Sequence, residues 1–420
     1  MTQPRHRRRL DVVTSTHRPI YVVWELTLAC DHACTHCGSR AGVARDGELS
    51  TEAAVAVAGQ LADAGTREVV LIGGEAYLHA GFLDVVRALA RRGVAVGLTT
   101  GGRGITPALA VDMKAAGLGQ ASVSIDGLAT THDRMRARTG SFDGALAALD
   151  HLRAAGIAIT ANTNLNRSNQ ADLESLYQVL KARGIVGWQL QLTAPLGRAA
   201  DRVAMLLQPW DLLTLVPRVA ALKQAARADG ITLMPGNNLG YFGPEETVLR
   251  SLGQDDRDHW RGCQAGKYVM GIESDGAVKG CPSLQTAHYV GGNLRDQALA
   301  DIWRDAPELT WNRGRTVDAL WGFCRTCDFA EACLGGCTFT AHAILGRPGN
   351  NPYCHYRART LAKRGVRERL VPATAAAGLP FDNGTFALIE EPLDAPDPAA
   401  TLPGERLVQI DRRPRRAPVE

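Results

Sequence analysis

The sequence lacks long apolar runs and carries little net charge. No stretch of its 420 residues comes near the roughly 18 consecutive apolar residues that predict a membrane-spanning helix. The basic N-terminal segment "RHRRR" is followed by "LDVVTSTHRP", which is not the apolar core of a secretion signal. The net charge of +4 comes partly from basic stretches near both ends, so it does not predict a nucleic-acid-binding groove. We therefore expect a cytoplasmic protein with neither a membrane nor a nucleic acid as partner.

Cysteine is absent from a long central stretch, because none occurs between Cys37 and Cys263. The cysteines fall instead into two groups, which is not the distribution of scattered core residues. Cytoplasmic thiols stay reduced, so this grouping predicts metal or redox chemistry rather than a disulfide framework. The first group is Cys30, Cys34 and Cys37, and the second is Cys263, Cys281, Cys324, Cys327, Cys333, Cys337 and Cys354.

Short apolar runs alternate with longer amphipathic segments after the first cysteine group. The runs are rich in Val, Ile, Thr or Leu and predict strands, whereas the longer segments have the spacing of helices. Strands that alternate with helices indicate a parallel sheet, either open or closed into a barrel, whose functional rim lies at the C-terminal ends of the strands. The predicted strands are 21–28, 68–74, 94–102, 120–127, 157–164 and 188–195, and the helices are 50–64, 80–92, 106–116, 143–155 and 170–183.

The remaining segments differ in composition. Residues 201–262 have a mostly helical pattern, and 263–356 combine many glycines with the second cysteine group, which suits a small fold organised by metal sites. From about residue 371 the chain is rich in Pro and Ala and predicts a loosely ordered tail. Within this tail, residues 385–391 and 406–412 have strand-like patterns that predict a hairpin.

The stretch "CDHACTHC" places three thiols in one tight loop. Thiolates favour zinc or iron–sulfur clusters, and a structural zinc site needs four ligands. His32 or His36 could supply the fourth ligand of a zinc knuckle. The gaps of three and two residues between the cysteines instead suit three corners of a cubane, so the spacing favours an iron–sulfur cluster over zinc.

The longer stretch "WELTLACDHACTHC" (24–37) resembles the Cys-x3-Cys-x2-Cys signature of the radical S-adenosylmethionine (SAM) superfamily. The resemblance implies an α/β fold, a partial (β/α)6 TIM-type barrel whose first strand precedes the signature. It also implies a [4Fe–4S] cluster held by Cys30, Cys34 and Cys37, with SAM chelating the fourth iron. Electron transfer from that cluster would cleave SAM to methionine and a 5′-deoxyadenosyl radical.

Polar residues at the strand ends resemble the SAM contacts of the same family. "LIGGEAYL" resembles its Gly-Gly-Glu-Pro motif, with Ala76 in place of the proline, and "SVSIDG" and "TANTN" resemble its fourth and fifth strands. His36 matches a position that lies near the adenine in the family. The resemblance therefore implies SAM contacts from His36, Gly73, Gly74, Glu75, Ser124, Asp126 and Asn162 or Asn164.

The second cysteine group could form a pair of structural zinc ribbons. Together with the first group, however, it resembles the SPASM extension of radical SAM enzymes, which binds auxiliary [4Fe–4S] clusters. The resemblance implies two such clusters. One would be held by Cys324, Cys327, Cys333 and Cys354, and the other by Cys263, Cys281 and Cys337 alone. We hypothesise that the second of these has an open iron site for a substrate group, or takes a non-cysteine ligand.

These assignments divide the chain into five parts. Residues 1–19 are a basic N-terminal tail, 20–200 the radical SAM partial barrel, and 201–262 a helical bridge. Residues 263–356 are the SPASM auxiliary-cluster domain, and 357–420 are a C-terminal helix and a Pro- and Ala-rich tail.

Enzymes that resemble this chain commonly modify peptides, so we expect oxidative modification or crosslinking of a ribosomally made peptide. The partners would be a peptide or small-molecule substrate and a reductant such as flavodoxin or ferredoxin. The sulfatase-maturing branch has an aspartate as base where this chain has Pro282, which disfavours that branch. A catalytic base is unassigned; Glu273 and Asp275 lie in the extension. Arg198 is either an anion contact or a solvated loop residue.

Two other functions fit the same residues. One is a decarboxylase or side-chain-modifying enzyme of haem-type tetrapyrrole biosynthesis, whose members share the "WELT" opening and a similar extension. The other is a non-catalytic iron–sulfur or zinc protein, which predicts no SAM cleavage and leaves the strand-end motifs unexplained.

Overall fold

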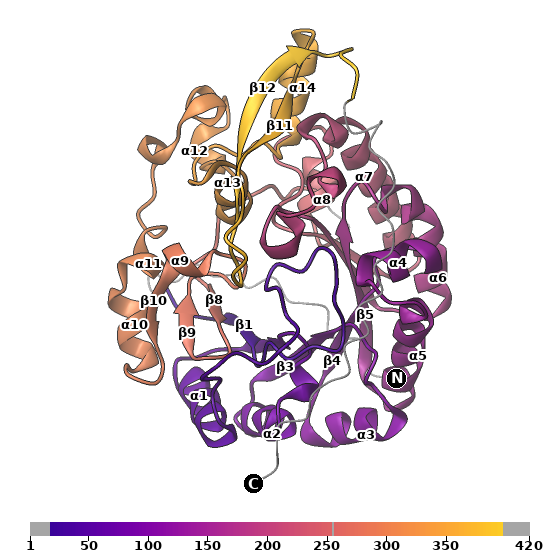
Figure 1. Ribbon diagram of the computed structural model, residues 1–420, viewed down its shortest axis with the longest axis vertical. Helices are drawn as coiled ribbons and strands as arrows, with labels where there is room; N and C mark the ends of the chain where they lie inside the picture. The colour runs from indigo at the N-terminus through magenta and orange to yellow at the C-terminus, as the bar shows by residue number, and fades with distance from the viewer. Residues whose placement is uncertain (1–16, 254–255, 398–420) are drawn as a thin grey trace.

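The computed structural model describes residues 17–253 and 256–397 (Figure 1). Its main sheet has the strand order β10-β9-β8-β1-β2-β3-β4-β5-β6-β7. Neighbouring strands from β1 to β7 pair in parallel and follow the chain, which confirms the predicted parallel α/β fold. The strands are β1 Tyr21–Glu25, β2 Glu68–Ile72, β3 Ala95–Thr100, β4 Gln120–Ser124, β5 Ala158–Leu165, β6 Gly187–Leu192, β7 Thr232–Pro235, β8 Val269–Ile272, β9 Ala277–Lys279 and β10 Val290–Asn293.

Helices cover the outside of this sheet and lie at the periphery of Figure 1. Those of the barrel are α1 Thr51–Asp63, α2 Phe82–Arg91, α3 Pro107–Ala116, α4 Ala129–Arg136, α5 Ser141–Ala154, α6 Leu173–Ala182 and α7 Leu212–Ala228. Those that follow are α8 Glu246–Arg250, α9 Thr286–Tyr289, α10 Leu299–Asp305, α11 Pro307–Thr310, α12 Ala330–Cys333, α13 Thr338–Leu345 and α14 His355–Lys363. None of the described helices has the length and hydrophobicity that crossing a membrane requires.

The helices form where the sequence supplies both caps and an apolar stripe. The hydroxyl of Ser50 accepts a hydrogen bond from the backbone of Ala53 at the start of α1. Helix α3 begins after Thr106, which caps it in the same way, and ends at Gly117, whose φ of +107° lies in the left-handed region. Along α1, the buried residues recur every three or four positions, so one face packs on the sheet.

The sequence predicted six strands of the barrel and missed the seventh, β7. This strand has only four residues and follows the long helix α7, in a region predicted to be mostly helical. Strand β8 was also unexpected in the main sheet. It comes from the cysteine-rich segment and pairs in parallel with β1, with Tyr21 opposite Val269. The cysteine-rich segment therefore extends the barrel sheet beyond its first strand.

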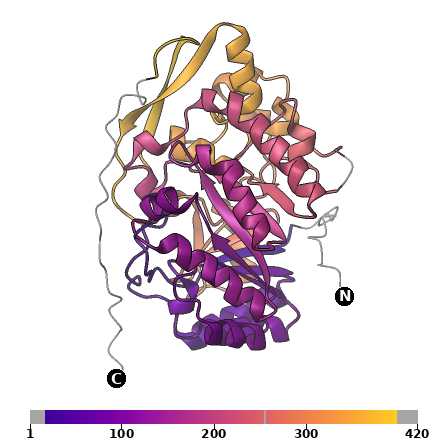
Figure 2. The ribbon, with the colours of Figure 1, turned by 90° about the vertical axis from the view of Figure 1, so that its right-hand side faces the viewer.

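The C-terminal residues are more ordered than the sequence predicted. Strand β11 (Val366–Thr374) pairs antiparallel with β12 (Thr385–Pro392) as a separate two-stranded sheet. Figures 1 and 2 show this hairpin above the barrel, packed beside α7 and α14. The prediction of a loosely ordered tail from residue 371 is therefore wrong for this hairpin. The predicted pairing of 385–391 with 406–412 stays a prediction, because 406–412 lies outside the described residues.

Candidate functional site

The loop after β1 carries the first three cysteines at the C-terminal ends of the parallel strands. The backbone N–H of His32 donates to the sulfur of Cys30 at 3.4 Å, and the Arg136 guanidinium donates to the sulfur of Cys34 at 3.4 Å. Burial raises the pKa of the Cys30 and Cys34 thiols, and Cys37 contributes to both increases. The three thiols are therefore close enough to influence one another, and a metal that binds them must displace their protons.

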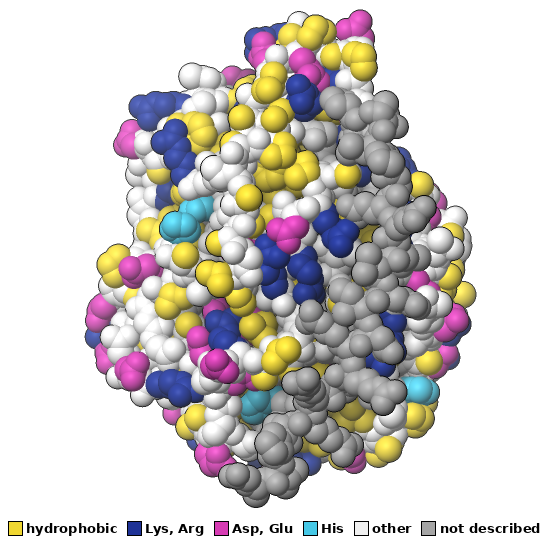
Figure 3. Space-filling view, in the orientation of Figure 1, with side chains coloured by type: hydrophobic (Ala, Val, Ile, Leu, Met, Phe, Trp, Pro, Cys, Tyr) yellow, Lys and Arg dark blue, Asp and Glu magenta, His cyan; other side chains and the backbone are white. Residues whose placement is uncertain are grey.

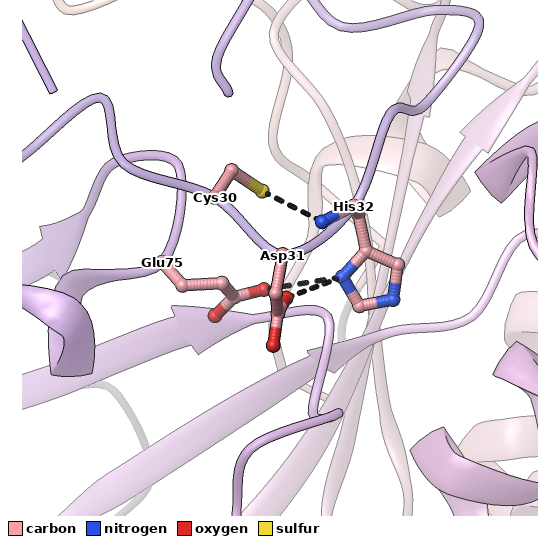
Figure 4. Close-up of side chains that lie close together, drawn as sticks. All are labelled: Cys30, Asp31, His32 and Glu75. Atoms are coloured by element: carbon pink, nitrogen blue, oxygen red, sulfur yellow. Dashed lines mark hydrogen bonds and ion pairs between the residues drawn. The ribbon is translucent and has the colours of Figure 1, made fainter. Parts of the chain in front are cut away.

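His32 lies beside Cys30 in a group of possible metal ligands that also includes Asp31 and Glu75 (Figure 4). The ligand atoms of these four residues lie within 4.8 Å of one another. Both nitrogens of His32 have partners, since Nδ1 lies 2.9 Å from Asp31 and Nε2 lies 3.4 Å from the Ser141 hydroxyl. These contacts hold the imidazole by hydrogen bonds and argue against His32 as the fourth ligand of a zinc knuckle.

The Gly-Gly-Glu segment packs directly against the cysteine loop. The N–H groups of Gly74 and Glu75 donate to the carbonyl oxygens of Thr27 and Ala29, at 2.7 and 2.8 Å. A Cβ on Gly74 would lie 2.2 Å from the Ala29 oxygen, so no larger residue fits. An incoming ammonium group can only donate hydrogen bonds, so its acceptors here would be backbone carbonyl oxygens or the Glu75 carboxylate.

The Glu75 carboxyl group is buried at the rim and is 2% exposed. It accepts hydrogen bonds from the Thr100 hydroxyl at 2.5 Å and the Gly101 N–H at 2.6 Å. Burial raises its pKa to about 8, and the negative charge of Asp31 adds to the shift. A cationic ligand beside Glu75 would favour its ionised form, so the site suits an ammonium group.

Asp126 lies just past the end of β4 and joins His36 to Arg136. Its Oδ2 atom is 2.7 Å from the Arg136 guanidinium and 3.3 Å from Nε2 of His36. Although burial opposes ionisation, the charge of Arg136 leaves the pKa of Asp126 below its ordinary value. Burial lowers the pKa of His36 to about 4, so this imidazole is neutral and is buried beside Asp126.

The sequence analysis missed Arg136, which stands among several arginines in "HDRMRARTG". A usable signal was the spacing of His132 and Arg136, which are four positions apart and both buried on one face of α4. His132 is the residue that orients this helix against the site. Its Nδ1 accepts the Asp126 N–H at 3.1 Å, and its Nε2 lies 3.1 Å from the Ser141 hydroxyl.

The strand-end residues line the inside of the barrel. Ser124 pairs with Asn162 across β4 and β5, and the backbone N–H of Asn164 donates to Asp126 at 2.9 Å. Asn162 and Asn164 in turn pair with Gln189 and Gln191 of β6. Both glutamines were missed by the sequence analysis, although their alternation with the buried Trp188, Leu190 and Leu192 was a readable signal.

Besides Oδ2 of Asp126, whose contacts are the ion pairs given above, three buried polar atoms in this region have no hydrogen-bond partner among the described residues. They are Nδ1 of His36, Nε of Arg136 and Oδ1 of Asn162. A buried polar group without a partner costs about 1 to 3 kcal/mol, so these atoms favour a polar ligand between them. Together with Glu75 and the three thiols, they fit a ligand that carries an ammonium group, a carboxylate and a nucleoside, as SAM does.

Arg198 has a structural role that the sequence did not reveal. Its guanidinium donates to the carbonyl oxygens of Cys34 at 2.7 Å and Ala41 at 3.1 Å. Its backbone N–H also donates to the Cys37 oxygen at 2.9 Å. In this structure Arg198 therefore holds the cysteine loop in shape. This role differs from both sequence-based interpretations, an anion contact and a solvated loop residue.

Four cysteines of the second group surround a small cavity, which also has five aromatic side chains in its wall. The N–H of Phe329 donates to the sulfur of Cys327 at 3.4 Å, and that of Arg357 to the sulfur of Cys354 at 3.5 Å. N–H donors aimed at sulfur stabilise thiolates, so this cavity fits an iron–sulfur cluster. The four cysteines are Cys324, Cys327, Cys333 and Cys354, and the aromatic residues are Tyr241, Phe242, Phe323, Phe329 and Tyr356.

The other three cysteines also lie near one another. Burial raises the pKa of Cys281 to about 12, and both Cys263 and Cys337 contribute to the increase. Burial likewise raises the pKa of Cys337 to about 11. Cys263 and Cys281 pack against a small apolar cluster separate from the main core. The structure thus brings together the set of three that the sequence predicted.

The acidic residues considered as catalytic bases are engaged in ion pairs. Glu273 lies 2.7 Å from Lys279 and 2.8 Å from Arg45, and Asp275 lies 3.3 Å from Arg45. These contacts connect the cysteine loop with β9, so both carboxylates have structural roles.

Known protein families match both cysteine regions. The model of the radical SAM superfamily matches residues 24–180, and that of the SPASM iron–sulfur cluster-binding domain matches residues 263–328. The mycofactocin maturase MftC of Mycobacterium ulcerans is 30% identical over 355 residues, which cover 82% of this chain and 90% of that protein. The chain belongs to the radical SAM superfamily. It is a radical SAM enzyme with a SPASM domain. Its cofactors are a [4Fe–4S] cluster and SAM, together with auxiliary iron–sulfur in the SPASM domain.

This radical SAM enzyme is also similar to proteins of another function. The AdoMet-dependent heme synthase of Nitratidesulfovibrio vulgaris is 28% identical over 363 residues, which cover 81% of this chain and 93% of that protein. In structure, the chain matches Streptococcus suis SuiB bound to the precursor peptide SuiA with a TM-score of 0.61 and 17% identity, covering 77% of this chain and 72% of SuiB. At that identity the match shows the fold alone.

Proposed function

We propose that this radical SAM enzyme oxidatively modifies or crosslinks a ribosomally made peptide. The observation that carries the proposal is the pair of amide side chains Gln189 and Gln191 on β6, which stand beside β5 and belong to none of the SAM contacts proposed below. Carboxamides carry both a donor and an acceptor, so they complement the N–H and C=O groups of a peptide backbone. A tetrapyrrole would instead present carboxylates, which favour cationic partners.

Four of the cations around the barrel mouth have partners in this chain. Arg45 and Lys279 pair with Glu273, Arg40 pairs with Asp201, and Arg198 donates to backbone carbonyls. Each of these charges is therefore neutralised or used by the fold. This arrangement supports a peptide over a substrate that carries several carboxylates.

Cys30, Cys34 and Cys37 would hold the first cluster, which leaves one iron for SAM. The first cluster and the bound SAM would together supply a 5′-deoxyadenosyl radical that removes a hydrogen atom from the substrate. Glu75 would accept hydrogen bonds from the SAM ammonium group, and the free Nε of Arg136 would donate to the SAM carboxylate. His36, Ser124, Asp126, Asn162 and Asn164 would complete the contacts along β4 and β5.

Two auxiliary clusters would lie in the SPASM domain. Cys324, Cys327, Cys333 and Cys354 would close one, and Cys263, Cys281 and Cys337 would hold the other with one iron open. The open iron would bind a substrate group or accept the electron that a substrate radical loses. A flavodoxin or ferredoxin would supply the electron for SAM cleavage.

A second candidate function is a step in haem-type tetrapyrrole synthesis. The similarity to the heme synthase of Nitratidesulfovibrio vulgaris favours it, since that match covers nearly all of the relative. Under this alternative, hydrogen abstraction and one-electron oxidation of a propionate side chain would release carbon dioxide and leave a vinyl group, so the substrate would lose carbon dioxide in addition to two hydrogen atoms.

One experiment separates the two candidates. The reconstituted enzyme is incubated anaerobically with SAM, dithionite and either iron coproporphyrin or synthetic peptides corresponding to short open reading frames beside its gene. We expect a peptide product lighter by two hydrogen atoms in mass spectrometry, with the porphyrin unchanged. Loss of carbon dioxide from the porphyrin, with every peptide unchanged, would reject the peptide function.

A further inference from the structure

The loop that connects β11 to β12 lies against the first cysteine loop, although the two are far apart in sequence. We call residues 375–384 the strap. Figures 1 and 2 show it descending from the hairpin to the loop after β1. The N–H of Phe381 donates to the Gly38 oxygen at 3.0 Å, and the Asp382 oxygen accepts the Gly197 N–H at 2.8 Å. The strap is thus attached to the residue that follows Cys37.

Asp382 fixes the strap in this position. Its carboxylate accepts a hydrogen bond from Nε of Arg40 at 2.9 Å, while the other nitrogens of Arg40 form a fork with Asp201 at 2.6 and 2.9 Å. The second carboxylate oxygen of Asp382 accepts the N–H groups of Gly378 and Leu379, at 2.5 and 3.0 Å. One side chain therefore both shapes the strap and binds it to the cysteine loop.

Phe381 connects the strap to the SPASM side of the molecule. Its ring centre lies 3.9 Å from Nζ of Lys279, two positions before Cys281, and both side chains are buried. The backbone of the same residue contacts Gly38, next to Cys37. Phe381 therefore contacts a near neighbour in sequence of each set of three cysteines.

The strap is held in a conformation that can be released. Phe381 has a φ of +54°, in the left-handed region, which costs a bulky residue about 1 kcal/mol or more. The neighbouring Leu379 is 63% exposed, and hydrophobic side chains gather on this face of the molecule along the hairpin (Figure 3). A few polar contacts and one cation–π contact hold the strap, rather than a continuous apolar core.

We propose that the strap is a gate over the barrel mouth, which closes the space between the two sets of three cysteines and opens to admit substrate. The proposal rests on the proposed function only in taking that space as the reaction centre. When the gate opens, the Arg40–Asp382 and Lys279–Phe381 contacts separate together. When it is closed, it shields the cysteine loop from solvent and from reagents.

Iron release tests the shielding without any substrate. The reconstituted enzyme is mixed with the chelator bathophenanthroline disulfonate, and iron loss is followed by absorbance. We expect Asp382→Ala and Phe381→Ala to lose iron several-fold faster than the unmodified enzyme, and the exposed control Leu379→Ala to match it. Equal rates for all four proteins, with unchanged thermal unfolding, would overturn the gate.

Hydrogen exchange of the unmodified holoenzyme tests the opening itself. The N–H groups of Phe381 and Gly197 donate across the strap contact, so they become free in the same event. We expect them to exchange at a shared rate at least tenfold faster than the paired amides of β11 and β12. Exchange as slow as that of the hairpin would show a fixed wall and overturn the gate. Neither assay depends on peptide modification, so failure of the proposed function would leave both results interpretable.

Discussion

At the scale of single residues, Arg136 is the buried cation beside Cys34 that the proposed SAM site would use. It is buried, pairs with Asp126 at 2.7 Å and keeps Nε without a partner among the described residues. Arg136→Lys keeps the charge but loses the planar fork. We expect the Kd of SAM to rise at least tenfold, since a hydrogen bond to a charged group contributes about 1.5 kcal/mol or more. Anaerobic calorimetry with the reconstituted enzyme measures it.

The matched control is Arg134→Lys, which changes an exposed arginine of the same helix. Its SAM affinity should equal that of the unmodified enzyme. An unchanged affinity in Arg136→Lys would remove Arg136 from the SAM site.

Glu25 gives the protein a pH-dependent stability. Its pKa is raised to about 7, chiefly by burial, against the opposing charge of Arg45. Because the folded value exceeds the ordinary 4.5, the stabilisation is complete below pH 4.5 and is lost as the pH rises through about 7. The loss amounts to about 3 kcal/mol. Glu25→Gln has no such dependence. The free energy of unfolding of Glu25→Gln minus that of the unmodified protein should therefore increase from about pH 5 to about pH 8.

Urea unfolding of the cluster-free protein at several pH values measures this difference. Glu390→Gln, at a carboxylate that is 51% exposed, is the control and should show no trend. A difference between Glu25→Gln and the unmodified protein that stays constant with pH would contradict the buried, protonated state of Glu25.

At the scale of elements, the turn after β6 supports the first cysteine loop. Gly197 has a φ of +56°, and a Cβ there would lie 2.2 Å from the Gly38 oxygen and 2.5 Å from the Cys37 oxygen. Gly197→Ala should therefore displace the loop and lower iron loading at the first site. Gly230→Ala is the control, because its φ of +74° carries similar strain but its Cβ meets no atom within 4 Å. Equal iron content in the two variants would show that the turn after β6 does not support the first cysteine loop.

The elements that the sequence predicted are those whose signals are local. The six strands and their helices follow from apolar periodicity and caps such as Ser50. Strand β7 was missed because four residues carry too little pattern. Strand β11 was missed because its order comes from distant contacts, such as the Leu370 N–H on Gln208 at 2.7 Å and Arg367 stacked 3.8 Å from the Trp210 ring.

At the scale of the whole molecule, the two cysteine groups predict how iron is divided among the three cluster sites. If all three sites hold [4Fe–4S] clusters, the reconstituted enzyme should contain roughly twelve iron atoms per chain. Cys327→Ala and Cys281→Ala should each remove about four, and the double variant about eight. Iron assays with protein determined by amino-acid analysis measure this. A loss of all SPASM iron in either single variant would show that the two sites do not load independently.

The candidate site could be predicted only as far as its motifs reach. The thiol spacings and the strand-end polar residues are written locally in the sequence, so Cys30, Glu75 and Asn162 could be named without a structure. For Arg136 and Gln189 the local spacing marked the face of an element but not its partners, and the strap had no local signal, because these roles depend on contacts between segments far apart in the chain. The pairing of β8 with β1 is of the same kind, since it joins residues 21 and 269.

The central claim is that three thiolates hold the first cluster and leave one iron for SAM. The most direct test is anaerobic reconstitution with iron and sulfide, followed by dithionite and SAM, with 5′-deoxyadenosine measured by chromatography. The unmodified enzyme should form 5′-deoxyadenosine, and Cys34→Ala should form none while keeping its auxiliary iron. Formation of 5′-deoxyadenosine by Cys34→Ala, or none by an unmodified enzyme whose first site is fully loaded, would contradict the account.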